Sequence, residues 1–134
     1  MNDVALRSLD WLARIQFSAD GCFSPVGSNG FYTRGKEMAH FDQQPVEACA
    51  MISACLEAAG MTGDDRWRTI ADNTFDWFLG RNDLRAPVYD PATGGCRDGL
   101  HPDRVNRNQG GESTLAFLMS LVEMQLAQNV LTEK

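Results

Sequence analysis

Two segments of the chain are apolar on every side of a helix, and this feature constrains the fold most. One begins at Pro45, a favoured first helical residue, and ends at Gly60, a favoured C-terminal cap. The other begins at Gly111 or Glu112 and runs to about Ala127, with apolar side chains around its whole circumference. A helix that is hydrophobic all round must be covered on every side. We therefore expect both segments to be inner helices.

Two further helices are expected, and both are amphipathic. The first spans about Val4 to Phe17, and the second starts near Asp64 and ends at Gly80. In the latter, apolar residues recur at the i, i+3, i+4, i+7 spacing of a half-exposed helix. The predicted order along the chain is therefore half-exposed, buried, half-exposed, buried.

The chain also repeats itself. The sequence DWL of residues 10–12 returns as DWF at 76–78, and the Gln-x-x-Glu motif of residues 44–47 returns at 109–112. Each unit contains an outer helix, a long loop and an inner helix. Such repeats stack because neither unit buries its apolar face alone.

These features predict an all-α fold, in which two consecutive αα-hairpins form a partial α/α toroid with long loops on one rim. The chain is expected to be a single helical domain, 1–134, with one hairpin repeat at about 1–60 and the other at about 61–128. The loops, about 18–44 and 81–110, exceed the ~12–15 residues beyond which structureless loops are often functional. A site is therefore expected on their shared rim.

Catalytic residues cannot be assigned from the sequence, but three carboxylates are candidates. Glu47 and Glu112 fall in the first turns of the two inner helices, where an acidic residue either caps the helix or serves as one of a pair of acid/base groups for glycoside chemistry. Asp98, which is followed by a glycine, is either a turn former or a ligand-binding group.

Amide, carboxylate, imidazole and aromatic side chains in the loops suit a ligand rich in hydroxyl groups. The predicted substrate-binding residues are Asp42, Gln43, Gln44, His101, Asn108, Gln109, Tyr32 and Arg34. Capping and loop packing are the alternatives for several of them. Two His-x-Asp motifs, at 40–42 and 101–103, lack the spacing typical of a metal site, so neither a metal nor a cofactor is expected.

Four stretches carry a resemblance to a known family. They are residues 41–48 (FDQQPVEA), 75–83 (FDWFLGRND), 89–100 (YDPATGGCRDGL) and 108–118 (NQGGESTLAFL). They resemble the C-terminal helical region of bacterial group 1 glycosyltransferases, which is similar in design to the six-hairpin glycosidase toroids. The resemblance implies a carbohydrate context. It also implies that this chain, with four helices, is a fragment of a larger toroid of about twelve.

The expected function is therefore that of a carbohydrate-binding or carbohydrate-processing helical segment of a glycosyltransferase- or glycosidase-like protein. The alternative is a non-catalytic helical interaction or docking module. A saccharide is the expected ligand, and a homo-oligomer, most simply a dimer, or association with the remainder of the toroid would cover the open flanks.

Other partner classes are disfavoured by charge and hydropathy. The net charge is −6 without a basic face, which excludes a binder of the nucleic-acid backbone. No apolar run approaches the ~20 residues of a membrane span. The first residues show no secretory signal, so the expected location is the cytoplasm.

Overall fold

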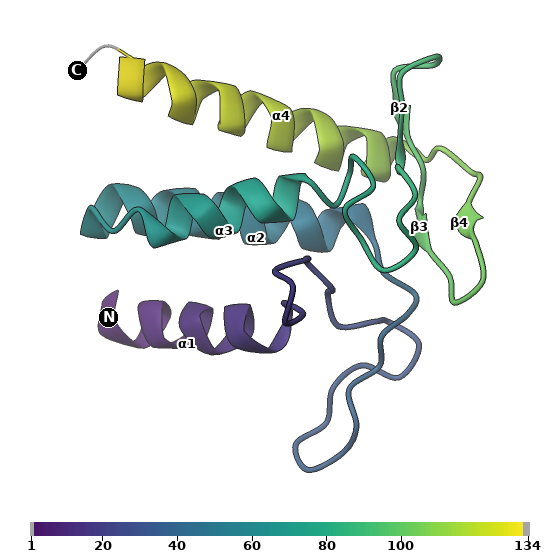
Figure 1. Ribbon diagram of the computed structural model, residues 1–134, viewed down its shortest axis with the longest axis horizontal. Helices are drawn as coiled ribbons and strands as arrows, with labels where there is room; N and C mark the ends of the chain where they lie inside the picture. The colour runs from purple at the N-terminus through teal and green to yellow at the C-terminus, as the bar shows by residue number, and fades with distance from the viewer. Residues whose placement is uncertain (1, 133–134) are drawn as a thin grey trace.

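The computed structural model describes residues 2–132 as four helices and four short strands. The helices are α1 (Asn2–Ile15), α2 (Pro45–Thr62), α3 (Arg66–Phe75) and α4 (Gly111–Thr132). The strands are β1 (Tyr89–Asp90), β2 (Gly95–Cys96), β3 (Gly99–Leu100) and β4 (Val105–Asn106). Figure 1 shows the helices lying alongside one another, with the strands and both long connections gathered at one end. None of the helices in the described part is long and apolar enough to cross a membrane.

The expected all-α fold, a partial α/α toroid of two αα-hairpins, is wrong. The connection between α3 and α4, residues 76–110, contains two small antiparallel sheets, one of β1 and β2 and one of β3 and β4. The molecule is a small mixed structure of helices and short strands. Strands of two residues are too short to show an alternating pattern, so the sequence predicts only a long loop here.

Helix α2 has one buried face, but it is not covered on every side as its apolar sequence predicts, because Val46, Ala50 and Ala54 are exposed along one stripe. It contacts both α3 and α4, and Ala48, Ile52 and Cys55 are fully buried. The core continues into the loops, where Phe23, Trp77, Phe78 and Leu100 are among the largest fully buried side chains. Burying a side chain of this kind contributes about 1.5–3 kcal/mol relative to leaving it exposed.

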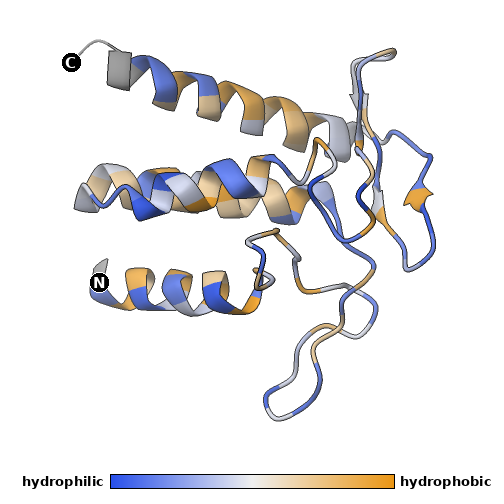
Figure 2. Ribbon diagram, viewed as in Figure 1, coloured by the Kyte–Doolittle hydropathy of each residue, from blue (hydrophilic) through white to orange (hydrophobic). Residues whose placement is uncertain are grey.

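Helix α4 is covered on one side only. Its buried residues, among them Phe117, Ser120 and Met124, follow one helical stripe that faces the core. On its other side five apolar side chains are exposed: Leu115, Leu118, Met119, Val122 and Leu126. Figure 2 shows hydrophobic residues along much of this helix. The expectation of a helix buried on every side is therefore wrong for α4 as well as for α2, because no other element of residues 2–132 packs over that face of α4.

The helix ends differ from those expected: α1 spans Asn2–Ile15 instead of about Val4 to Phe17, and α4 continues past Ala127 to Thr132. Helix α2 continues past Gly60 to Thr62, and Gly63 caps it with φ 69°, its N–H donating to the Ala59 carbonyl oxygen at 2.9 Å. The left-handed conformation suits glycine at this position. Helix α3 ends at Phe75, and turns rather than helix lead on to Gly80.

Candidate functional site

The first long connection, residues 16–44, is joined to the second, residues 76–110, by a backbone bridge. Gln43 and Leu100 each donate the backbone N–H to the other's carbonyl oxygen at 3.0 Å. Gly99 allows this approach: its φ is +143°, and a Cβ atom there would lie 1.9 Å from the Gln43 carbonyl oxygen. The bridge fixes the two connections against each other, although they lie far apart in the sequence.

The side chain of Gln43 strengthens this junction. It is buried, its Nε2 donates to the His40 carbonyl oxygen at 2.8 Å and to Asp83 Oδ2 at 2.5 Å, and its Oε1 accepts from Trp77 Nε1 at 2.9 Å. Each polar atom of the amide is therefore already used within the protein. Gln43, predicted to bind substrate, has a structural role in this arrangement.

A polar pocket of about 240 Å³ lies beside the bridge, between the two connections. Its lining residues are Ser28, Asp42, Gln43, Gln44, Asp98, Gly99, Leu100, His101 and Asn106. Of the predicted site residues, it brings together Asp42, Gln44, Asp98 and His101, with Gln43 contributing to its wall. Their side chains include carboxylates, an amide and an imidazole, which can donate to and accept from a polar ligand.

Asp42 and His101 form a direct pair in this pocket. His101 Nδ1 lies 2.5 Å from Asp42 Oδ1, and both side chains remain partly open to solvent. The backbone carbonyl of Asp42 accepts from the N–H and the hydroxyl of Ser28, at 3.0 and 3.1 Å. The backbone N–H of His101 donates to the Arg104 carbonyl oxygen at 2.9 Å, in the turn between β3 and β4. Backbone contacts in each connection therefore position one member of the pair.

Asp98 lines the same pocket, yet its oxygens serve the start of α4. Oδ1 accepts from the Gly110 N–H and from the Ser113 hydroxyl, both at 2.7 Å, and Oδ2 accepts from Asn108 Nδ2. Burial alone would raise the pKa of Asp98, but these three hydrogen bonds outweigh it and lower the pKa. Asp98 is thus an ionised carboxylate that caps a helix from a distant loop.

The two glutamates do not line the pocket. Glu47 Oε2 accepts the Gln44 N–H at 2.8 Å, as in a capping box. Burial raises the pKa of Glu47, and the hydrogen bond from Gln44 offsets part of that effect. Glu112 is exposed in the first turn of α4. The geometry supports the capping interpretation of Glu47 and does not bring the two carboxylates into the pocket as a pair.

Two predicted amides hold the loops together instead of lining the pocket. Gln109 Oε1 accepts from Thr93 Oγ1 at 2.8 Å, and its Nε2 donates to Asp90 Oδ2 at 3.2 Å, so it fastens the β1–β2 hairpin. Asn108 donates to Asp98. Their hydrogen-bonding groups are therefore engaged within the second connection.

The predicted substrate-binding residues Tyr32 and Arg34 lie elsewhere. Tyr32 stacks on Trp11 of α1, with ring centroids 6.2 Å apart, and Arg34 is exposed in the same loop. Neither lines the pocket. Conversely, sequence reasoning missed Ser28, because a single serine in a long loop carries no signal of its own. Asn106, two residues before the predicted Asn108, is likewise absent from the predicted site residues.

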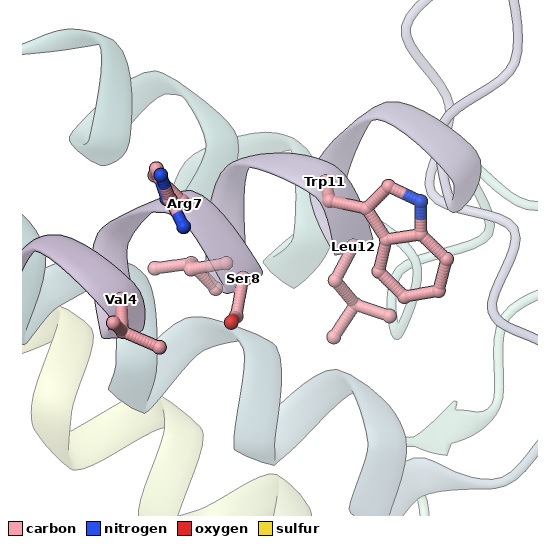
Figure 3. A pocket seen from close by; sticks show the side chains of 6 residues that line it. Val4, Arg7, Ser8, Trp11 and Leu12 are labelled. Atoms are coloured by element: carbon pink, nitrogen blue, oxygen red, sulfur yellow. The ribbon is translucent and has the colours of Figure 1, made fainter.

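A second pocket, of about 580 Å³, lies along α1. Val4, Ser8 and Leu12 follow one side of the helix at intervals of four residues, with Trp11 beside them (Figure 3). Its lining is mainly apolar and comes from one helix. It therefore lacks the convergent polar groups that orient a small ligand.

Metal ligands do not converge in the described residues. Among residues 2–132, no group of three or more His, Cys, Asp or Glu side chains could hold a metal ion. Of the two His-x-Asp motifs, only Asp42 and His101 meet; His40 is exposed, and Asp103 pairs with Arg104 at 2.7 Å. No protein-family model and no curated protein matches the chain.

Proposed function

We propose that the pocket between the two long connections binds carbohydrate, and that the chain serves as a carbohydrate-binding or carbohydrate-processing segment of a glycosyltransferase- or glycosidase-like protein. The observation that carries the proposal is the convergence of Asp42, Gln44, His101 and Asn106 from two connections onto one polar pocket. A saccharide offers neighbouring hydroxyl groups that both donate and accept, and such a lining can match them. The resemblance to the helical region of group 1 glycosyltransferases points to the same ligand class.

The volume of the pocket limits the size of the ligand that it can hold. Pockets for drug-sized ligands span about 300–1,000 Å³, and this one is about 240 Å³. It suits one sugar residue or the end of a chain better than a long oligosaccharide.

We also propose a cytoplasmic location. The four cysteines are free, as is usual for thiols in the reducing cytoplasm.

Saturation-transfer NMR with neutral methyl glycosides tests the proposal. We expect saturation of the protein to reach the ring protons of a bound glycoside, and Gln44→Ala to weaken that signal. Gln125→Ala is the matched control, because Gln125 is exposed on α4 and lies outside the pocket. Equal signals from both variants, or none from the wild type with any glycoside, would argue against a saccharide site here.

A docking module remains the second candidate, and the exposed apolar side of α4 favours it. The side chains of Leu115 and Leu126 are 61% and 60% exposed. Leu118, Met119 and Val122 lie between them. Contiguous exposed apolar surface of this kind marks interaction sites. We propose a second copy of the chain as its occupant, since two-fold symmetry lets one such face cover another.

A further inference from the structure

One ring nitrogen in the pocket is not used by the protein. The Nδ1 atom of His101 faces the Asp42 carboxylate at 2.5 Å, whereas its Nε2 has no hydrogen-bond partner among residues 2–132. An ionised carboxylate only accepts hydrogen bonds. In a neutral imidazole, a proton held at Nδ1 leaves the lone pair of Nε2 available as an acceptor.

We infer that Asp42 holds neutral His101 in the Nδ1–H tautomer, and that Nε2 accepts a hydrogen bond from a hydroxyl group of an uncharged sugar. The inference rests on the proposed saccharide function and deepens it. His101 would contact the ligand directly. Asp42 would act through His101, as a positioning residue.

The charges around the pocket select an uncharged ligand. Asp42 and Asp98 both line it, and none of its nine described lining residues is Lys or Arg. The lowered pKa of Asp98 keeps that carboxylate ionised at neutral pH. A sugar phosphate or a uronate would bring a third negative charge without a cation to meet it. A neutral pyranoside avoids this repulsion and still supplies hydroxyl donors.

The tautomer can be measured in the free protein. Long-range ¹H–¹⁵N correlation at pH 8 distinguishes a protonated Nδ1 from a protonated Nε2 in a neutral imidazole. We expect the Nδ1–H form for His101, and a return toward the usual tautomer mixture in Asp42→Ala. Exposed His40 is an internal control, and Asp103→Ala is the matched control variant. A dominant Nε2–H form of His101 in the wild type would overturn the inference.

The sugar contact is tested separately by titrating methyl glucoside, methyl mannoside and methyl galactoside, with methyl glucuronide and glucose phosphate as charged counterparts. His101→Phe should weaken binding of the neutral glycosides by about 3- to 10-fold, the effect of one neutral hydrogen bond. His101→Gln keeps an acceptor oxygen and should bind within about twofold of the wild type. Asp42→Ala should reduce affinity as well, whereas Asp103→Ala should not.

The possible failures are distinguishable. If neutral glycosides bind but His101→Phe leaves affinity unchanged, the proposed function stands and the inference is wrong. Equal losses in folded His101→Phe and His101→Gln would mean that His101 shapes the pocket without accepting from the sugar, which also overturns it. Stronger binding of the charged sugars would contradict the uncharged ligand. If no glycoside binds the wild type, the proposed function itself fails, whatever tautomer His101 adopts.

Discussion

Neighbouring glutamines in this chain have different roles, although the sequence presents them alike. Gln43 is buried and bonds to Trp77 and Asp83, whereas Gln44 is exposed and lines the pocket. Trp77 and Asp83 lie more than 30 residues away from Gln43 along the chain. Local pattern therefore predicts that this segment is polar, and tertiary packing decides which amide is structural.

Replacing Gln43 should destabilise the protein more than replacing its neighbour. In Gln43→Ala, Trp77 Nε1 and the Asp83 carboxylate lose a buried partner, and the free energy of unfolding should fall by about 1–3 kcal/mol. Gln44→Ala should change it by less than about 1 kcal/mol. Urea titration of both variants would measure the difference, and equal midpoints would contradict the structural role of Gln43.

Asp98 should make stability depend on acid pH. Its pKa is lowered on folding, so its contribution is complete above the ordinary aspartate pKa of about 3.9 and is lost as the pH falls through the lower folded value. Asp98→Ala removes the cap of α4 and should cost about 1 kcal/mol at pH 7.

The measurement is the free energy of unfolding of wild type and variant between pH 2.5 and pH 7. The difference in the free energy of unfolding between wild type and variant should decrease below about pH 4. Asp103→Ala is the control, since Asp103 is exposed and, within residues 2–132, forms an ion pair only with the adjacent Arg104. If the difference in the free energy of unfolding between wild type and Asp98→Ala does not vary with pH, the ionised form of Asp98 does not stabilise the fold.

At the scale of elements, long periodic segments were predictable and short ones were not. Helix α2 begins at Pro45 as its sequence indicates and buries one face in the core, while Val46, Ala50 and Ala54 on another side are exposed. The sequence of α4 has almost the same character, and its outer face is open too, because burial depends on how many neighbours exist and not on the helix alone. The strands β1 to β4 were missed because two residues hold too little pattern, and their pairing depends on contacts such as that of Gln109 with Thr93.

A buried position in α2 and an exposed position in α4 should therefore respond differently to the same substitution. Ile52 is fully buried in α2, so Ile52→Asp places an unpaired charge in the core and should unfold the protein. Leu118 in α4 is 43% exposed, and Leu118→Asp should leave the fold intact. Circular dichroism and thermal melts would decide between these outcomes. Unfolding by both would mean that the outer face of α4 is covered in solution by something essential to folding.

At the scale of the whole molecule, the open side of α4 predicts association. Each Leu-type side chain left exposed forgoes about 1.5–3 kcal/mol of burial, and five apolar residues share this face. We expect the wild type to dimerise at micromolar concentration in sedimentation equilibrium. Val122→Asp should give a folded monomer, because Val122 is 52% exposed and its replacement charges the face.

Thr69→Asp is the control for that measurement, since Thr69 is an exposed residue of α3. It should leave the dimer unchanged. A monomeric wild type across the concentration range would remove the basis for the docking surface. Loss of the dimer in both variants would place the interface elsewhere.

The bridge between Gln43 and Leu100 has a consequence for how such a chain can evolve. Each half of the molecule supplies one wall of the pocket, and one pair of backbone hydrogen bonds sets their register. An insertion in one connection shifts its residues relative to the Gln43–Leu100 bridge. The pocket then keeps its shape only if the other connection changes in length as well. The two connections should therefore vary in length together across descendants, whereas the turn at Gly63 takes no part in the bridge and lacks this coupling.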